Sequence, residues 1–374
     1  MLYRIGDIYA ERSERGAADM ELLSVTMNGG VMQRSEIEGK DNSSEDKSNY
    51  KVVRKGDMVY NSMRMWQGAN GVSSYDGIVS PAYTVLTAKL PICNEYFAAL
   101  FKNYKLINEF KKNSQGMTSD TWNLKYPQIK TIKVYLPRVI EQEKVASLLV
   151  TLDKRIAAQA TLVEQLKKYK RGLVFTAFSP CNPYGITVEP TPLTHLLQEY
   201  RKRETTNLRV CSVAVAKGVV DQLEHLGRSF AASDTSHYGR VKPGDVVYTK
   251  SPTGDFPYGI VKQNWLQEDV AVSPLYGVYT PLTYEVGYLI HTYFEQSSNA
   301  NNHLRTLAQK GAKNTINITT AHFLDKDIPF PNREDEVSML VGLFSRINKR
   351  IESEESKLNK IVTQRKTLMQ QLFI

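Results

Sequence analysis

One feature constrains the fold of this chain more than any other: the sequence contains an internal repeat. Residues 50–60 read YKVVRKGDMVY, and residues 238–248 read YGRVKPGDVVY, an offset of 188 positions. Farther along, LDKRI at 152–156 matches INKRI at 347–351, an offset of 195. Other matches follow in the same order from residue 5 to residue 178, so a tandem duplication explains the pattern better than chance. The two copies should therefore form similar structures.

The first part of each copy alternates short apolar or β-branched runs with Gly-Asp, Asn-Gly and Ser-Pro pairs. This pattern predicts strands joined by tight turns. In residues 52–60 and 241–248, a Gly-Asp pair predicts a turn that leads into a strand, because glycine supplies the backbone freedom that such turns need. Residues 96–112 and 286–307 predict helices. We therefore expect a mixed α/β domain in each copy.

The second part of each copy has a different pattern. Residues 141–178 contain no proline and only one glycine, Gly172, while Pro137 precedes the segment and Pro180 follows it. Acidic residues stand in its first turn, and Lys and Arg gather near its end. These are the charges that the helix dipole favours at each terminus. The segment is therefore predicted to be one long helix.

Apolar residues step by three and four along this helix in both copies, which is the spacing of a coiled-coil seam. Polar residues interrupt the two seams at equivalent places, Gln159 and Lys170 in the first copy and Glu354 and Arg365 in the second. An ordinary amphipathic surface helix is the alternative, but matched breaks in two copies favour the coiled coil. The predicted seam consists of Leu149, Leu152, Ile156, Val163, Leu166 and Leu173 in the first copy, and Phe344, Ile347, Ile351, Leu358, Ile361 and Leu368 in the second.

The order of these parts determines how the two helices can pack. The first helix leads from one mixed domain into the other, so a second helix that packs on it must run back antiparallel to it. We expect an α+β fold with internal pseudo-two-fold symmetry. Its parts are a mixed domain at 1–137, a helix at 138–179, a second mixed domain at 180–331 and a second helix at 332–374. A 38-residue helix such as 141–178 is about 57 Å long.

The charge of the chain favours a polyanionic partner. Lys and Arg number 48 against 39 Asp and Glu, a net charge of +9, which indicates nucleic acid first. Two similar domains at a fixed spacing suit two half-sites on double-stranded DNA. The centres of such half-sites are about 34–36 Å apart. Because the two domains differ in sequence, the two half-sites should differ, and the full target should be asymmetric and split.

Three sets of loop residues are candidates for DNA contacts, because Lys and Arg can hold phosphates while Arg, Asn and Gln can read base edges. The first set follows equivalent strands: Arg64, Trp66, Gln67 and Asn70, with Lys250, Ser251 and Thr253 in the second copy. The second set surrounds a glycine: Lys112, Ser114, Gln115, Thr118 and Ser119, with Lys310, Lys313, Asn314 and Thr315. The third set is expected to anchor phosphates: Arg12 and Arg15, with Arg201 and Arg203. A solvated loop position is the alternative for each residue, and partial burial in the core is the alternative for Trp66 and Trp122.

Motifs for catalysis are missing. The sequence has no G-x-x-x-x-G-K-[ST] phosphate loop and no G-x-G-x-x-G after a strand. Residues 181–185, CNPYG, superficially resemble the Asn-Pro-Pro-Tyr loop of adenine methyltransferases, but the second proline and a glycine-rich cofactor loop are missing, so a turn is favoured. All six histidines lie in the second copy, so no histidine chemistry is shared by both domains, and each is expected at the surface or against DNA.

Cysteine usage and hydropathy indicate a cytoplasmic protein with no membrane partner. Cys93, Cys181 and Cys211 lie far apart, form no metal-ligand spacing and cannot all pair, which fits a reducing compartment. No apolar run is long enough to span a bilayer, and the first residues do not form a secretion signal.

The helical segments resemble a known family. Residues 136–146, LPRVIEQEKVA, and LDKRI at 152–156 look like the conserved helical region of the specificity (S) subunits of Type I restriction–modification systems, and LKKYKRGL at 166–173 is similar too. The second copy departs from this form, because PNRED at 331–335 replaces the Pro…Glu-Gln form and Asn348 replaces Asp. The resemblance covers the whole chain, since the family also alternates two target-recognition domains with two helices.

The resemblance implies a non-catalytic subunit that recognises a DNA sequence. It implies that each mixed domain is a target-recognition domain for one half of a bipartite site. It also implies that the helices set the spacing and bind two modification (methyltransferase) subunits, and that restriction subunits complete a complex that cuts DNA. The chain itself then needs no cofactor, because S-adenosylmethionine belongs to the methyltransferase partner, and ATP and Mg to the restriction partner.

Two other functions stay open at this point. The chain is alternatively a coiled-coil adaptor that joins two proteins, with incidental basic charge. An enzyme that acts on nucleic acid is a third hypothesis, but it needs a cofactor or metal site in each copy, and the sequence shows none. A steep linear fall of log K with log salt would separate a DNA reader from an adaptor.

Overall fold

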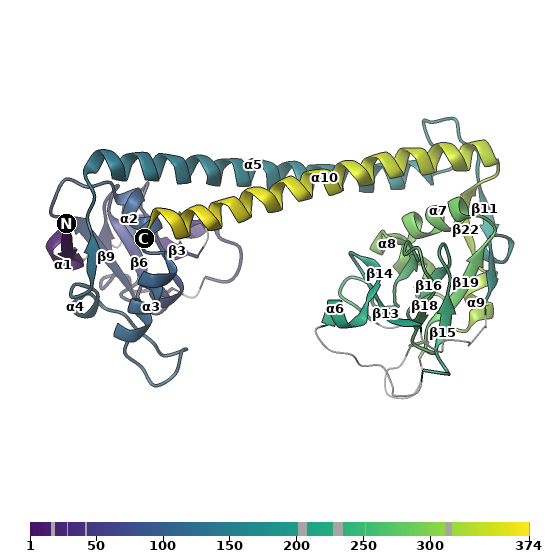
Figure 1. Cartoon of the computed structure of the whole chain (residues 1–374), viewed down its shortest axis with the longest axis horizontal. Coiled ribbons are helices and arrows are strands. Elements are labelled where there is room, and N and C mark those ends of the chain that lie inside the picture. The colour runs from purple at the N-terminus through teal and green to yellow at the C-terminus, as the bar shows by residue number, and fades with distance from the viewer. Residues whose placement is uncertain are drawn as a thin grey trace. The chain divides into compact units, whose positions relative to one another are not determined.

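The computed structural model describes residues 1–15, 19–27, 29–41, 43–200, 208–226, 235–250, 252–310 and 316–373. The chain divides into two compact units (Figure 1). Unit 1 combines Met1–Ala160 with Ser356–Ile374, and unit 2 is Thr161–Glu355. Both long helices, α5 (Val139–Ala177) and α10 (Glu334–Leu372), therefore contribute one segment to each unit.

Unit 1 is built on an antiparallel sheet with the strand order β2-β9-β6-β7. Its strands are β2 (Tyr9–Glu11), β9 (Tyr83–Ala88), β6 (Met58–Asn61) and β7 (Asn70–Val72). Three strand pairs surround it: β1 (Leu2–Arg4) with β10 (Lys133–Tyr135), β3 (Leu23–Thr26) with β4 (Gly30–Gln33), and β5 (Lys51–Val53) with β8 (Gly77–Val79). The short helices are α1 (Ile5–Ile8), α2 (Asn94–Leu100), α3 (Tyr104–Asn113) and α4 (Tyr126–Ile129).

Unit 2 repeats this order of elements. Its central sheet is β12 (Leu197–Glu199), β19 (Gly277–Pro281), β16 (Val246–Tyr248) and β17 (Val261–Gln263). A second sheet is β14 (Gly218–Asp221), β13 (Arg209–Ala214), β18 (Val270–Val272) and β15 (Gly239–Val241). The remaining strands form the pairs β11 (Val188–Pro192) with β22 (Asp327–Pro331) and β20 (Gln309–Lys310) with β21 (Ile316–Asn317). The helices are α6 (Gln222–Leu226), α7 (Tyr284–Phe294), α8 (Ser297–Arg305) and α9 (Thr320–Asp325).

The duplication predicted from the sequence is confirmed by strand topology. The order β2-β9-β6-β7 in unit 1 corresponds element by element to β12-β19-β16-β17 in unit 2. A detail outside the central sheets also recurs: Arg209 of β13 pairs in parallel with Val270 of β18, and Leu22 forms a parallel bridge with Ile78 in unit 1. The fold is therefore mixed α and β in both units.

The Gly-Asp turns are equivalent in the two units. Gly56 and Gly244 have positive φ angles of 92° and 88°, a conformation that favours glycine. The carboxylate of Asp57 accepts the backbone N–H of Arg54 at 2.8 Å, and that of Asp245 accepts the N–H of Lys242 at 2.8 Å. Each turn leads into a central strand, as predicted, and a further short strand precedes it.

The segments expected as single helices are each divided in two. In unit 1 the break falls between α2 and α3, where the side chain of Asn103 accepts the N–H of Lys105 at 2.9 Å and so caps α3. The same side chain donates to the carbonyl of Met369 in α10 at 3.2 Å. In unit 2, α7 ends at Phe294 and α8 begins at Ser297. The helix breaks because Asn103 favours a cap over a helix interior.

The two long helices pack antiparallel in each unit, as a coiled coil predicts. In unit 1, Leu149 lies in the same apolar cluster as Met369, and Asp153 forms an ion pair with Arg365. In unit 2, Lys167 pairs with Glu355 at 2.9 Å, and the ring of Phe178 stacks on that of Phe344 with centroids 6.4 Å apart. Residue numbers thus rise along one helix as they fall along the other.

The predicted seam residues face the interior of each unit. Six of the twelve are buried: Leu149, Leu152, Val163, Leu173, Phe344 and Ile351. The other six are half-buried: Ile156, Leu166, Ile347, Leu358, Ile361 and Leu368. The polar breaks have partners. Arg365 pairs across the helices with Asp153, and the buried carboxylate of Glu354 pairs with Arg350 at 2.9 Å. A break in the seam is tolerated because each charge is neutralised.

Candidate DNA interface

The first candidate loop of unit 1 begins where β6 ends at Asn61. The Asn61 side chain accepts the N–H of Met63 at 3.0 Å and bends the chain away from the strand. A short 3-10 turn over Met65–Gln67 follows, and Gly68 ends it with a φ of 88°. This geometry leaves Arg64 exposed and Gln67 half-buried.

The second candidate loop follows α3. Gly116 has a φ of 140°, and a Cβ there would meet the carbonyl oxygen of Thr121 at 2.6 Å, so the turn requires glycine. Around it, Gln115, Thr118 and Ser119 are exposed to solvent, as is Met117, whose side chain is 100% exposed. Short polar side chains at a glycine turn can follow the shape of a ligand surface.

These two loops meet through their tryptophans. The rings of Trp66 and Trp122 pack edge to face with centroids 5.2 Å apart. The ammonium of Lys111 lies 5.8 Å from the centroid of Trp66, and the indole N–H of Trp66 donates to the carbonyl of Met63 at 3.0 Å. Both tryptophans are half-buried, so they join the loops into one surface, called here the paired-loop surface (residues 61–67 and 111–122). Sequence pattern alone does not indicate that the ammonium of Lys111 lies over the ring of Trp66.

Three candidates in unit 1 are turned to internal contacts. Asn70 is fully buried in β7, and its side chain donates to the carbonyl of Gly68 at 3.1 Å. The hydroxyl of Ser114 donates to the carbonyl of Phe110 at 2.8 Å, and Lys112 pairs with Glu109 at 2.7 Å on the exposed face of α3. Asn70 therefore cannot reach bound DNA without a rearrangement of β7.

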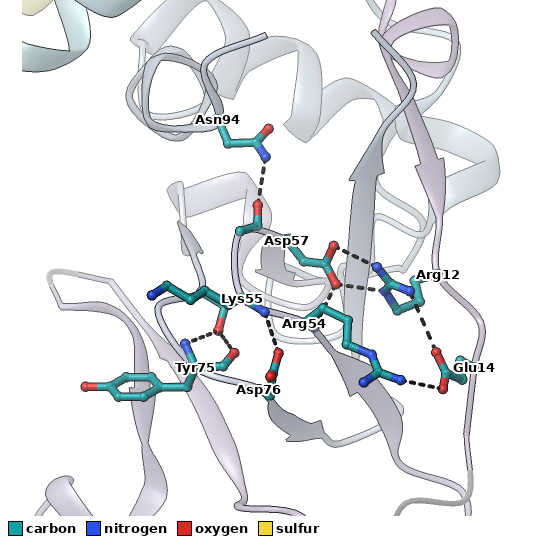
Figure 2. A network of polar contacts seen from close by, with 10 residues as sticks. Arg12, Glu14, Arg54, Lys55, Asp57, Tyr75, Asp76 and Asn94 are labelled. Atoms are coloured by element: carbon teal, nitrogen blue, oxygen red, sulfur yellow. Dashed lines mark hydrogen bonds and ion pairs between the residues drawn. The ribbon is translucent and has the colours of Figure 1, made fainter. Parts of the chain in front are cut away.

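Arg12 takes part in an internal ionic network, which Figure 2 shows. Its guanidinium donates to both carboxylate oxygens of Asp57, at 2.8 and 3.1 Å, and lies 3.7 Å from Glu14. The hydrogen bond to Asp57 raises the pKa of Arg12. Arg54 pairs with the same Glu14 at 3.0 Å. Arg12 thus supports the Gly-Asp turn, whereas Arg15 is exposed; phosphate contacts by either residue stay a prediction.

In unit 2 the structure describes only part of the candidate set. Lys250 follows β16 with a φ of 56°, which is rare for a residue with a side chain, and burial lowers its pKa. Thr253 is exposed and closes a small backbone bridge with Phe256. Lys310 lies in β20. Outside the described residues lie Arg201, Arg203, Ser251, Lys313, Asn314 and Thr315.

The expectation that every histidine lies at the surface or against DNA is wrong for two of them. His291 and His303 are each 3% exposed. Burial lowers the pKa of His291 well below its ordinary value and that of His303 to about 3, so both are neutral at pH 7. They lie on the core faces of α7 and α8, and a single sequence carries no signal that a polar ring will be packed there. His195, His237 and His322 are exposed as expected.

Comparison with known proteins identifies a domain family within the chain and similar solved structures. Residues 9–168 match the family model of the Type I restriction modification DNA specificity domain. The fold is similar to that of the Type I restriction–modification S subunit from M. genitalium, at 11% identity and a TM-score of 0.60, covering 100% of this chain and 96% of that one. A chain from a structure of type I R-M complex assembly and conformational transition shares 15% identity at a TM-score of 0.56, covering 100% and 96%. No curated protein sequence matches significantly.

The repeated mixed fold with paired long helices is thus similar to the fold of a Type I restriction–modification S subunit. Within it, residues 9–168 form a Type I restriction modification DNA specificity domain, which assigns DNA recognition to this part of the chain. This match favours DNA recognition over an adaptor with incidental charge. Across the part of the chain that the structure describes, no helix is long and apolar enough to span a bilayer.

Proposed function

We propose that each unit reads one half of a bipartite, asymmetric DNA target. The observation that carries this proposal is a shared scaffold with different loops. The strands β6 and β16 are equivalent, yet Arg64 and Trp66 follow the first, whereas Lys250 and Thr253 follow the second. Direct readout depends on the side chains that face the base edges, so unlike loops should select unlike half-sites.

We also propose that the chain is a non-catalytic scaffold whose helices bind two modification subunits, to which restriction subunits are added. Large apolar side chains that remain exposed along α5 and α10 support a protein interface there, if they gather into a contiguous patch when the subunits meet. Ile140 and Phe175 are 57% and 74% exposed. The further members of this set are Val139, Leu148, Val150, Tyr169, Met339 and Val362.

The cofactors would be bound by the partner subunits rather than by this chain. S-adenosylmethionine would be bound by the modification subunits, and ATP and Mg by the restriction subunits. We place the complex in the cytoplasm, where its DNA target lies. The free thiols of Cys93, Cys181 and Cys211 are compatible with a reducing compartment.

Methylome sequencing tests the reading of two half-sites. Cells that carry this chain with its modification subunit should show methylation within one split motif whose halves differ. Exchange of residues 1–136 for the first domain of another family member should change one half and leave the other intact. A change in both halves, or an unsplit motif, would contradict independent reading by the two units.

A further inference from the structure

Unit 2 contains a cavity, lined by both charged and apolar side chains, that DNA reading through the loops does not explain. Its volume is about 520 Å³. The turn between β13 and β14, strand β17, helix α7 and the unit 2 segments of α5 and α10 surround it. Ligand pockets commonly have volumes of about 300–1,000 Å³. The cavity is thus large enough for a small ligand.

Lys262 lines this cavity from β17 and is 2% exposed. In the described part of the chain, its ammonium has no ion pair or hydrogen bond. Burying an unpaired charge destabilises a fold. That cost is visible in the pKa of Lys262, which burial lowers, while Glu295 opposes and Lys170 adds to the shift. A ligand with negative charge would remove the penalty.

His291 supplies a second donor from α7. Its Nδ1 accepts the backbone N–H of Gln263 at 3.0 Å, so in the neutral ring the proton is on Nε2. The ring stacks on Trp265 with centroids 4.4 Å apart, which fixes its orientation. No acceptor for Nε2–H is present among the residues that the structure describes. Two donors on adjacent elements, from side chains only 2% and 3% exposed, therefore have no acceptor among the described residues.

The charges around the cavity favour an anion. Five cationic side chains line it against three carboxylates. Two cations are neutralised, because Lys170 pairs with Glu295 and Lys167 with Glu355. Arg171 and Lys217 are exposed and line the cavity together with Lys262. A phosphate group, with a charge of about −1.5 to −2 at pH 7 and several acceptor oxygens, complements this lining.

The equivalent place in unit 1 has different chemistry. Val59 pairs with Gly71 in β7, and the matching Val247 pairs with Lys262 in β17, so glycine replaces this lysine. Gly71 cannot be enlarged, because a Cβ there would meet the Cα of Gly30 at 2.8 Å. Ala98 lies six residues before the start of α3 at Tyr104, and His291 lies six residues before the start of α8 at Ser297. Ala98 therefore takes the place of His291. The two donors are therefore a property of unit 2.

We propose that this unit 2 cavity binds a phosphate group, held by the Lys262 ammonium and the His291 Nε2–H, with Arg171 and Lys217 at the rim. The phosphate comes either from a free phosphate compound or from the DNA backbone. Only the second source rests on the proposed function.

Thermal unfolding of the full chain tests the site, with inorganic phosphate titrated at constant ionic strength against chloride. Phosphate should raise the Tm of the wild type, because a ligand that binds only the folded state stabilises it by mass action. Lys262→Met should raise the Tm without phosphate, since the unpaired charge is gone, and should weaken phosphate binding at least about tenfold. Lys349→Met, an exposed position on α10 outside the cavity, is the matched control and should respond like the wild type. Lys217→Met, on an exposed turn, should weaken phosphate binding without altering the fold.

Two results would overturn the site: a wild-type Tm that responds equally to phosphate and chloride, or a Lys262→Met variant with lower Tm and an undiminished phosphate response. A second assay separates the sources, using the chain with its modification subunits on its target duplex. If Lys262→Met weakens duplex binding and lowers the log K–log salt slope by about one, the phosphate is that of DNA. If phosphate raises the Tm but duplex binding is unchanged, the ligand is free. A wild type that binds no duplex while phosphate still stabilises it would refute the proposed function and leave the site intact.

Discussion

Replacing Asp57 with Asn measures how strongly charge stabilises the Gly-Asp turn of unit 1. Asp57 is 6% exposed and accepts two hydrogen bonds from the Arg12 guanidinium in addition to that from Arg54. Asn keeps the size and one acceptor but removes the charge that holds Arg12. Hydrogen bonds to charged groups contribute about 1.5–3 kcal/mol each. Because the Arg12 side chain is 25% exposed, solvent screening reduces the sum, and we expect unfolding to become easier by about 2 kcal/mol.

The equivalent turn of unit 2 supplies a matched control. Asp245 accepts the N–H of Lys242 and the hydroxyl of Thr280, but Tyr200 takes the place of Arg12. Burial raises the pKa of Asp245. Its charge therefore imposes a penalty that is present above the folded-state pKa and is relieved as pH falls through it. Asp245→Asn should consequently cost less than half as much as Asp57→Asn at pH 7.

Urea unfolding of the full chain, followed by circular dichroism, gives the required free energies. A double-mutant cycle of Arg12→Met and Asp57→Asn should return a coupling of about 1–2 kcal/mol. Equal costs at Asp57 and Asp245, or a coupling near zero, would refute the reasoning. The same Arg12→Met variant decides its role at DNA: a structural residue leaves the salt slope of duplex binding unchanged, whereas a phosphate contact lowers it by about one.

Two further predictions concern the helices and the paired-loop surface. The double variant Ile156→Asp, Ile351→Asp places charge in the seam and should destabilise helix packing by about 2–4 kcal/mol. It should weaken binding of modification subunits in a pull-down more than it alters the circular dichroism of the mixed domains. Unaltered assembly would contradict a seam role. Trp66→Ala removes the ring that joins the two loops at Trp122, and it should weaken duplex binding about tenfold in a fluorescence anisotropy titration while the unit stays folded; full affinity would exclude this surface from the interface.

The duplication, the turns and the long helices could be predicted because each has a local signature. A Gly-Asp pair before an apolar run indicates a turn and a strand wherever it occurs, and a repeated seam indicates paired helices. The break before α3 could not be predicted, because the periodicity of residues 96–112 is compatible with a continuous helix through Asn103. Asn103 acts as a cap only through the hydrogen bond that its side chain accepts from the N–H of Lys105.

The site was less predictable than the fold, because exposure depends on tertiary packing. Asn70 and Arg12 have the residue types of DNA contacts, yet one is buried in a strand and the other is held by a carboxylate 45 positions away. Lys262 is the opposite case. From the sequence, a lysine in a short strand indicates a solvated sheet edge, and the residues next to it in the sequence do not reveal the cavity that it lines. Cross-chain pairing and burial of polar groups are properties that one sequence does not encode locally.

The division of α10 between the units has a consequence for how such proteins can change their target. The core of unit 1 is completed by Met369 and Phe373, and the ring of Phe373 packs on Tyr96 with centroids 5.3 Å apart. A recombined gene that acquires a new N-terminal segment keeps the old C-terminal one, so the newcomer must present an aromatic or apolar partner where Tyr96 stands. Compatibility with a few inherited side chains, rather than similarity across the whole segment, would then determine which exchanges yield a working protein.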